Sequence, residues 1–310
     1  MKKQKKPSMK KKFNIDKLRI CFKQPADLFE KILKSKTDLM DIGGNISLYI
    51  IRDEEEETPS KLMANVILHD EDDFLFGHFL FNNSKKYEGL CWLTLDNRAF
   101  YKNYKGVGAY SFVYYLNAIA YRLWLIYNNI TEIEICADSI SNIDGKLRKL
   151  IRDHSNYEMI LNGKKITDPF RKIKNYHEAF SRSRDRLLPS PTLYFEQVKK
   201  DAPLMRVYNK SVEISDNEDQ KKYIEEWNDF GKKPIHRAEI RLKNESIKQA
   251  WAKFTEHLPD DESMKQPDGI TQMLDDEDFL EWLWREYTNR IVTFNSQHGE
   301  KITLRDLIEP

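Results

Sequence analysis

Residues 130–138, Ile-Thr-Glu-Ile-Glu-Ile-Cys-Ala-Asp, alternate between apolar and polar side chains. Because successive side chains of a β-strand point to opposite faces, this pattern predicts a strand with Ile133, Ile135 and Ala137 on its apolar face. The opposite face would carry Glu132, Glu134, Cys136 and Asp138. A strand of this kind fits a sheet that helices cover on one face only, and its other face is then free to form a site.

Two later segments show the same alternation and add cations and a tyrosine. The run 204–210 predicts a strand with Arg206, Tyr208 and Lys210 on one face. The run 235–243 predicts a second strand whose polar face carries Arg237, Glu239, Arg241 and Lys243. We therefore expect one polar sheet face on which carboxylates, cations and Tyr208 lie together.

The rest of the chain predicts an α+β fold with flanking helices. Apolar residues near a period of 3.6 predict a helix over 110–127, and a further amphipathic pattern predicts one over 276–290. Other expected strands are 18–22, 46–52, 62–69, 76–81, 90–95 and 192–195, and other expected short helices begin near 25, 145 and 245. Residues 215–222 read as an acidic connection.

The charges are unevenly distributed although the formal net charge is only +1. Residues 1–12 hold seven lysines and no acid, which suits either a disordered, solubilising tail or an arm that contacts nucleic acid. Residues 164–210 carry 12 Lys and Arg against five acids. Such a basic stretch can place one face of the molecule on a polyanion while acidic regions are repelled.

Three widely spaced cysteines, Cys21, Cys91 and Cys136, stand among apolar neighbours. They predict reduced core thiols in a cytoplasmic protein. No stretch approaches the ~18 consecutive apolar residues of a transmembrane helix, so we expect no membrane partner.

The predicted polar face suits phosphoryl transfer to a protein nucleophile. Tyr208 can attack a phosphodiester if its proton is removed and the charge on the phosphate is neutralised, and Lys210 is placed to favour its deprotonation or to stabilise the leaving oxygen. The carboxylates of neighbouring strands predict an oxygen cage for Mg²⁺ or Mn²⁺. The alternatives are a tyrosine that only packs and cross-strand ion pairs that only stabilise the sheet.

Four blocks in order resemble the replication initiation factor family, the rolling-circle Rep proteins of staphylococcal-type plasmids and related relaxases of conjugative elements. The blocks are Ile-Thr-Glu-Ile-Glu-Ile-Cys-Ala-Asp at 130–138, Thr-Leu-Tyr-Phe at 192–195, Leu-Met-Arg-Val-Tyr-Asn-Lys-Ser-Val-Glu at 204–213 and Arg-Ala-Glu-Ile-Arg-Leu-Lys at 237–243. Four positions depart from the family pattern: Glu196-Gln197 replace a glycine-serine step, Asn209 replaces an aspartate, and Glu134 stands where aspartate is usual.

The resemblance implies a metal-dependent, topoisomerase-like nickase. A tyrosine cleaves one strand at an origin, becomes joined to the 5′-phosphate and leaves a 3′-hydroxyl. It also implies an antiparallel palm of RNA-recognition-motif type with an N-terminal elaboration. The implied catalytic residues are Tyr208, Lys210 and Arg206, and the implied ligands of Mg²⁺ or Mn²⁺ are Glu134, Asp138, Glu239 and Glu213.

The candidate DNA contacts lie mainly in the basic stretch, where aromatic residues are interleaved with cations. They are Lys164, Lys165, Arg171, Lys172, Lys174, Arg182, Arg184 and Arg186, together with Arg237 and Arg241. Contacts of this type bind phosphates, although the same stretch also suits a solvated loop. No two histidines lie within two positions of each other, which excludes a nuclease with the two-histidine HUH motif.

The expected domains are a tail (1–12), a strand-rich region of unassigned role (13–105), a catalytic palm (106–255) and an acidic loop with a helical end (256–310). The expected function is nicking and rejoining at a plasmid replication origin. Alternatives are a relaxase acting at a transfer origin, a non-catalytic DNA-binding protein on the same scaffold, or a structural protein. By family analogy, two protomers would cooperate as a homodimer, with a host helicase and polymerase as further partners.

Overall fold

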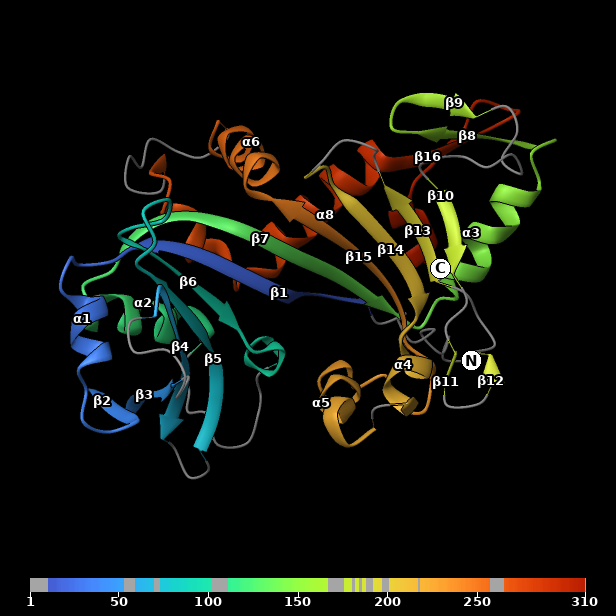
Figure 1. Ribbon diagram of the computed structural model, residues 1–310. Coiled ribbons are helices and arrows are strands. Elements are labelled where there is room, and N and C mark those ends of the chain that lie inside the picture. The colour runs from blue at the N-terminus through green and yellow to red at the C-terminus, as the bar shows by residue number, and fades with distance from the viewer. Residues whose placement is uncertain are drawn as a thin grey trace, which may run out of the picture. The chain divides into compact units, whose positions relative to one another are not determined.

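A computed structural model shows how these segments are arranged (Figure 1). It describes residues 11–52, 59–69, 73–101, 111–166, 176–179, 182–183, 186–187, 192–196, 201–216, 218–256 and 265–309. The chain divides into two compact units. Unit 1 comprises Met1–Asn14, Glu134–Leu242 and Glu277–Pro310, and unit 2 comprises Ile15–Ile133 and Lys243–Asp276.

Unit 1 is built on an antiparallel sheet with helices beside it. Its strands follow the order β10 (Tyr176–Ala179), β13 (Thr192–Glu196), β14 (Leu204–Asn209), β15 (His236–Lys243) and β7 (Ile126–Ser139). The helices are α3 (Ile143–Arg152), α4 (Lys210–Asp216), α5 (Glu218–Asn228), α8 (Glu277–Ile291) and α9 (Leu304–Ile308). Smaller strands are β8 (Tyr157–Leu161), β9 (Lys164–Ile166), β11 (Arg182–Ser183), β12 (Arg186–Leu187), β16 (Val292–Ser296) and β17 (Lys301–Ile302).

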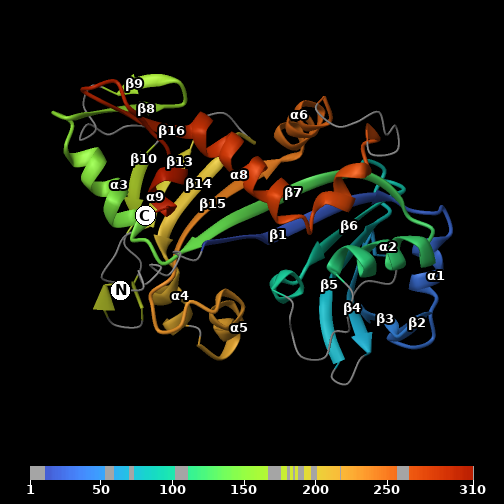
Figure 2. The ribbon, with the colours of Figure 1, turned by 180° about the vertical axis from the view of Figure 1, so that it is seen from behind.

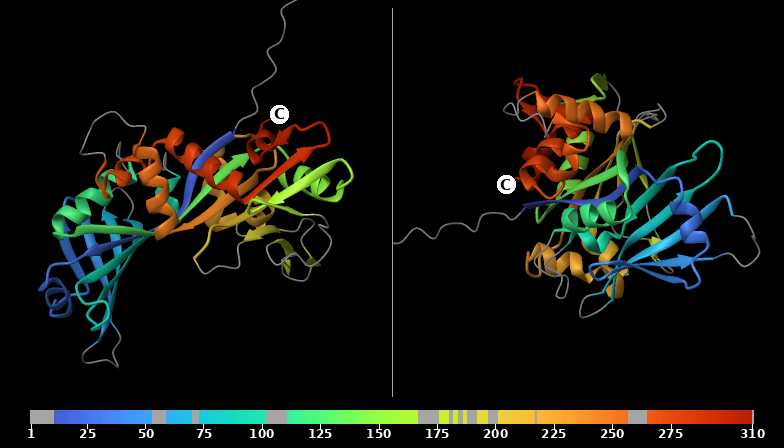
Figure 3. Two further views of the ribbon diagram at one scale, coloured as in Figure 1. Left: turned by 90° about the horizontal axis from the view of Figure 1, so that it is seen from above. Right: turned by 90° about the vertical axis from the view of Figure 1, so that its left-hand side faces the viewer.

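One face of this sheet is the apolar core of unit 1. Met205 and Val207 of β14 and Ala238 and Ile240 of β15 are fully buried there. Helix α8 runs along this side, as the view from behind shows (Figure 2), and the indole of Trp284 donates a hydrogen bond of 3.0 Å to the Ala238 carbonyl. The C-terminal helix α9, red in Figure 3, lies beside α3. With one face so covered, the polar side chains of β14 and β15 occupy the other face.

Unit 2 contains a second stretch of antiparallel pairing. Its strands follow the order β1 (Lys11–Lys23), β6 (Leu90–Leu95), β5 (Asp73–Asn82), β4 (Lys61–His69), β3 (Ile46–Ile51) and β2 (Leu39–Gly43). Helices α1 (Leu28–Leu33), α2 (Phe112–Arg122) and α6 (Asn244–Thr255) and the short helices η1 (Asn97–Phe100) and η2 (Gly269–Met273) complete it. Apolar residues of α2 pack against the sheet, for example Tyr115 with Phe76 at 6.0 Å between ring centroids.

A bulge between Val66 and Ile67 adjusts the pairing of β4 with β5. Because the bulge offsets the two-residue alternation, both Phe76 and Phe79 are fully buried on the same core. Gly77 lies at this point, and a Cβ added there would be 2.6 Å from the Thr94 carbonyl oxygen. A glycine is therefore required for the close approach of β5 to β6.

The expectation of a mixed helix and strand fold with antiparallel sheet pairing is confirmed, while the RNA-recognition-motif topology stays a prediction. All three cysteines are free and buried, as expected. None of the described helices has the length and apolarity needed to cross a membrane. The predicted tail lies outside the described residues up to position 10, and Lys11 and Lys12 belong to β1.

Two element predictions need correction. The helix expected over 110–127 ends at Arg122, because Trp124 adopts a positive φ of 54° and the chain enters β7 at Ile126. The acidic connection expected over 215–222 falls within the helical region α4 and α5. Ile214 and Ile224 are buried, so this polar segment is held to the core by one apolar residue from each helix.

Candidate active site

The site forms where β14 pairs with β15 on the polar face of unit 1. In the register, Arg206 lies opposite Glu239 and Tyr208 lies opposite Arg237. Tyr194 of β13 lies opposite Arg206 on its other side. Side chains directly opposite each other on antiparallel strands share a face and are close enough to interact. The pairing thus brings together the tyrosine and Glu239, which stand 31 positions apart in the sequence.

The Tyr208 hydroxyl lies between a carboxylate and an ammonium group. It donates a hydrogen bond of 2.9 Å to Glu239 Oε2, and it accepts one of 3.4 Å from Lys210 Nζ. Lys210 Nζ also lies 5.6 Å from the centroid of the tyrosine ring. A carboxylate that can take the phenolic proton and a cation that stabilises the resulting phenolate are the two groups that a tyrosine nucleophile needs.

The sequence predicted Lys210 on the strand that carries Tyr208. In the structure Lys210 is instead the first residue of helix α4. The Asn209 side chain accepts a hydrogen bond from the Val212 amide at 3.3 Å, in the manner of a helix N-cap, and α4 begins at Lys210. The Lys210 amide bonds the Ile235 carbonyl at 2.8 Å. The ammonium group is therefore held beneath the tyrosine by a helix start, and the Lys210 side chain is only 2% exposed.

Glu213, one turn along α4, neutralises Lys210. Its carboxylate forms an ion pair of 2.9 Å with Lys210 and a second ion pair with Lys221 of α5. Burial alone would raise the pKa of Glu213, but the two ammonium groups outweigh burial and lower that pKa to about 2. Glu213 is thus a charged partner of Lys210 at neutral pH. Lys221 was not anticipated from the sequence, because its segment was expected to be a connection.

Arg206 joins the carboxylates of two strands. Its guanidinium forms an ion pair of 2.9 Å with Glu134 of β7 and another with Glu239 of β15. The Arg206 side chain remains 31% exposed, so part of it faces solvent on the open side of the sheet. This arrangement places a second cation beside the tyrosine-bound carboxylate.

Asp138 and Arg237 form a closed pair beneath the site. The Asp138 carboxylate accepts hydrogen bonds from Arg237 at 2.6 and 2.8 Å and from the Asn228 amide at 2.8 Å. Both side chains of the pair are 0% exposed. Arg237 was expected to contact DNA, yet it has no exposed surface for that role. Asn228 was not anticipated at all, because a buried amide at the end of a polar helix has no distinctive sequence pattern.

The four predicted metal ligands are each paired with a cation of the chain. Among the described residues, no group of three or more histidine, cysteine or acidic side chains is arranged to hold a metal ion. Asp138 is engaged by Arg237 and Asn228, and Glu213 by Lys210 and Lys221, so these two carboxylates do not fit one oxygen cage in this arrangement. Glu134 and Glu239 do converge, but on Arg206. Binding of Mg²⁺ or Mn²⁺ by these residues stays a prediction.

The predicted DNA contacts are described only in part. Lys164 and Lys165 are exposed on β9, where Lys165 pairs with Glu158. Arg241 is half-buried on β15. Arg171, Lys172, Lys174 and Arg184 lie outside the described residues, and of Arg182 and Arg186 only the backbone is described, in β11 and β12. Binding of DNA by this stretch stays a prediction.

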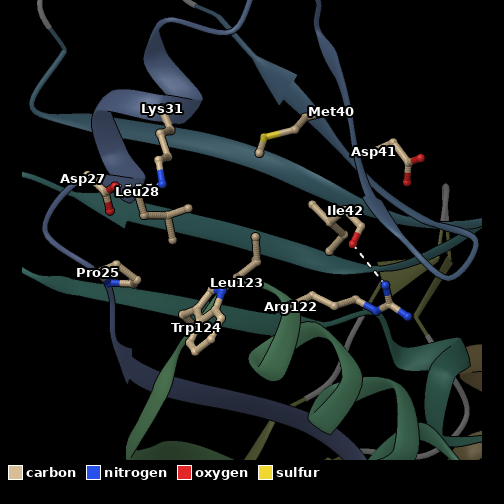
Figure 4. A pocket seen from close by; sticks show the side chains of 10 residues that line it. All are labelled: Pro25, Asp27, Leu28, Lys31, Met40, Asp41, Ile42, Arg122, Leu123 and Trp124. Atoms are coloured by element: carbon tan, nitrogen blue, oxygen red, sulfur yellow. Dashed lines mark hydrogen bonds and ion pairs between the residues drawn. The ribbon is translucent and has the colours of Figure 1, made fainter.

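A cavity of about 580 Å³ lies within unit 2, and none of the predicted site residues lines it. Figure 4 shows its lining from α1, β2 and the end of α2. Arg122 donates a hydrogen bond of 3.2 Å to the Ile42 carbonyl at its rim. Gly44 has a φ of +60°, and a Cβ added there would be 2.3 Å from the Arg122 guanidinium. Its lining mixes apolar side chains with the charged residues Asp27, Lys31, Asp41 and Arg122.

Comparisons with known proteins show a likeness to solved structures but none to sequence families. No family model matches the chain, and no curated protein matches it in sequence. Among solved structures, the chain is similar to a rolling circle replication initiator protein from Geobacillus stearothermophilus, with 12% identity over 97% of this chain and 92% of that chain and a TM-score of 0.48. Similarity at this level does not establish a common family, so the functional conclusion has to come from this chain's own residues.

Proposed function

We propose that this protein cleaves and rejoins one strand of DNA through Tyr208 and thereby initiates rolling-circle replication of a plasmid or mobile element. The observation that supports the proposal is the Tyr208 hydroxyl, held between Glu239 at 2.9 Å and Lys210 at 3.4 Å on the polar face of unit 1. The four sequence blocks that resemble replication initiators lead to the same tyrosine.

The proposed cleavage is a transesterification. The Tyr208 oxygen forms a bond to phosphorus, and the bond between phosphorus and the 3′-oxygen breaks. Glu239 accepts the phenolic proton, and the 3′-oxygen leaves as a hydroxyl after taking up a proton, so that the proton count is unchanged. The 5′-phosphate remains joined to the tyrosine. Attack of a 3′-hydroxyl on this phosphotyrosine reverses the step and rejoins the strand.

Two cations supply the charge stabilisation in this proposal. Lys210 stabilises the phenolate as it forms, because its ammonium group already contacts the hydroxyl. Arg206 is partly exposed and lies beside Glu239, where its guanidinium can bind non-bridging oxygens of the phosphate. Preorganised cations of this kind act without reorganisation during the reaction.

A non-catalytic DNA-binding protein on the same scaffold is a second candidate. The closed pair of Asp138 with Arg237 favours it, because a carboxylate held in this way is not open to a metal ion. A relaxase would use the same tyrosine chemistry as a replication initiator and would differ in the DNA that it recognises. Formation of a covalent adduct therefore separates the nicking enzyme, whether initiator or relaxase, from the non-catalytic DNA-binding protein.

The decisive experiment measures a covalent protein–DNA adduct. Purified protein is incubated with supercoiled plasmid that carries the DNA flanking its own coding sequence, with Mn²⁺, and the products are separated under denaturing conditions. We expect relaxed DNA bound to protein, with the adduct mapped to Tyr208 by mass spectrometry of tryptic peptides. Tyr208→Phe should abolish the adduct, and Glu239→Gln should slow its formation by about 10²–10⁴-fold, the usual contribution of a general base.

Tyr194→Phe is the matched control, because Tyr194 lies on the neighbouring strand opposite Arg206 but is not the proposed nucleophile. It should form the adduct at the wild-type rate. An adduct that persists in Tyr208→Phe would exclude Tyr208 as nucleophile. DNA binding by the wild-type protein without any adduct would instead support the non-catalytic candidate.

A further inference from the structure

One face of the unit 2 sheet presents polar, aromatic and apolar side chains in a continuous row. The cross-strand register places Leu39, Tyr49, Asn65, His78, Thr94 and Arg19 opposite one another from β2 to β1. The alternate residues of these strands form the buried core. In Figure 1 the strands β4 and β5 lie in front of α2, which covers their other side. We call the face that carries this row the open face.

Large side chains on the open face are unusually exposed. Tyr49 is 47% exposed, Met63 48% and Leu39 49%. Single exposed apolar residues are common, but here they follow one another on adjacent strands of one sheet. A flat surface of this kind is suited to planar or apolar groups of a partner.

Aromatic rings and cations alternate at the β5–β6 end of the open face. Lys86 Nζ lies 4.9 Å from the centroid of Tyr87, whose ring lies 5.6 Å from that of Trp92 at an angle of 85°. On the other side, Arg19 Cζ lies 5.8 Å from the Trp92 centroid. Interleaved aromatic and basic side chains are the pattern by which proteins bind single-stranded nucleic acid, since rings stack on bases and cations bind phosphates.

Positive charge is in excess beside this row. Lys17 and Lys243 both pair with one carboxylate, that of Glu132. Burial, followed by repulsion from Lys17 and Arg19, lowers the pKa of Lys243. Arg19 Nε is buried and has no hydrogen-bond partner among the described residues. Two lysines on one carboxylate, with Arg19 over the neighbouring Trp92 ring, leave a local positive charge that an anionic partner can neutralise.

We propose that the open face binds single-stranded DNA, with bases stacked on Tyr49 and Trp92 and phosphates bound by Lys17, Arg19 and Lys243. The local excess of cations favours a polyanion over an apolar protein surface, and stacking on the exposed Tyr49 ring and the half-buried Trp92 ring requires bases that are not paired in a duplex. The inference rests on the proposed function in taking DNA as the polyanion, but it does not depend on the chemistry of Tyr208.

The test measures the binding of fluorescein-labelled (dT)20 by fluorescence anisotropy, with the full chain in EDTA. We expect the wild-type affinity to fall steeply as salt is raised. Arg19→Gln with Lys243→Gln should weaken binding and reduce the slope of log K against log salt by about 1.4, because each phosphate contact on a single strand contributes roughly 0.7. Trp92→Leu should weaken binding about tenfold through lost base stacking.

The matched control is Lys31→Gln with Lys34→Gln, because both lysines are exposed at the C-terminal end of α1, where Lys31 pairs with Asp27 and Lys34 with Glu30. This variant removes the same charge and should bind with the wild-type salt slope. A melting curve of each variant shows whether it is folded. If Trp92→Leu is unfolded, the proposal is still tested by the affinity and salt slope of the variant Arg19→Gln with Lys243→Gln.

Tyr208→Phe separates this inference from the proposed function. It should bind (dT)20 like the wild type while forming no covalent adduct. If the Arg19 and Lys243 variant binds with unchanged affinity and slope, the open face is not the binding surface, whatever the outcome at Tyr208. Absence of wild-type binding at low salt, or equal affinity for a 20-base-pair duplex, would also overturn the proposal.

Discussion

At the scale of the single residue, the charge state of Glu213 is set by two lysines from different helices. Its pKa of about 2 lies below the ordinary value of 4.5, so the folded protein binds the proton less readily than the unfolded chain. The stabilisation that follows is fully present above pH 4.5 and is lost as the pH falls through the folded pKa. Acid therefore weakens the support of Lys210 between about pH 4.5 and pH 2.

The corresponding prediction concerns the variant Glu213→Gln. We expect it to lower the free energy of unfolding at pH 7 by about 1–3 kcal/mol, since a shift of one pKa unit corresponds to about 1.4 kcal/mol and the side chain is partly exposed. The difference from wild type should shrink as the pH is lowered from 4.5 toward 2. Urea unfolding curves at a series of pH values measure both effects.

Glu226→Gln is the control for this measurement, because Glu226 is an exposed glutamate on α5, the helix that carries Lys221. It should leave stability unchanged at every pH. A pH-independent loss in Glu213→Gln would show that the residue acts through packing and not through its charge.

At the scale of the element, the buried pair of Asp138 and Arg237 joins β7 to β15 beneath the candidate site. Arg237→Met should destabilise the protein by about 3–5 kcal/mol, because it leaves a buried carboxylate without its partner. Urea unfolding measures the loss. The double variant Asp138→Leu with Arg237→Met removes both charges and should recover much of it, since apolar residues of similar volume replace buried ion pairs at little cost.

A cost below about 1 kcal/mol for Arg237→Met would contradict the role assigned to this pair.

The strands that carry the tyrosine could be predicted from the sequence, but the helix that begins at Lys210 could not. The alternation of β14 and β15 is a property of adjacent residues and can be read directly, whereas the start of α4 at Lys210 depends on the Asn209 cap and on the bond from Lys210 to Ile235 of another segment.

At the scale of the whole molecule, binding of the predicted Mg²⁺ or Mn²⁺ can be tested without an activity assay. Each predicted ligand already pairs with a cation of the chain, with Arg206 shared by Glu134 and Glu239, so we expect millimolar Mg²⁺ or Mn²⁺ to leave the melting temperature of the DNA-free protein unchanged. Differential scanning calorimetry measures this, with Ca²⁺ as a control ion. A saturable rise with Mn²⁺ alone would reveal a site that is already formed and would contradict the arrangement of these pairs.

The sequence by itself predicted the mixed helix and strand character and a polar face of three strands that carries Tyr208 and Glu239, with Glu239 expected there as a metal ligand. Periodicity of two or of 3.6 is a local property, so a linear pattern is sufficient to specify it. The four carboxylates were also identified, but their shared role as metal ligands could not be tested by pattern alone.

Only the tertiary structure decided which cation each carboxylate meets. Asp138 and Arg237 are 99 positions apart, and Glu134 and Arg206 are 72 apart, so their pairing depends on strand order. The open face of unit 2 also depends on strand order, because its row of residues is aligned only when six strands pair in register. Electrostatic partners depend on distance in space, which a sequence pattern does not contain.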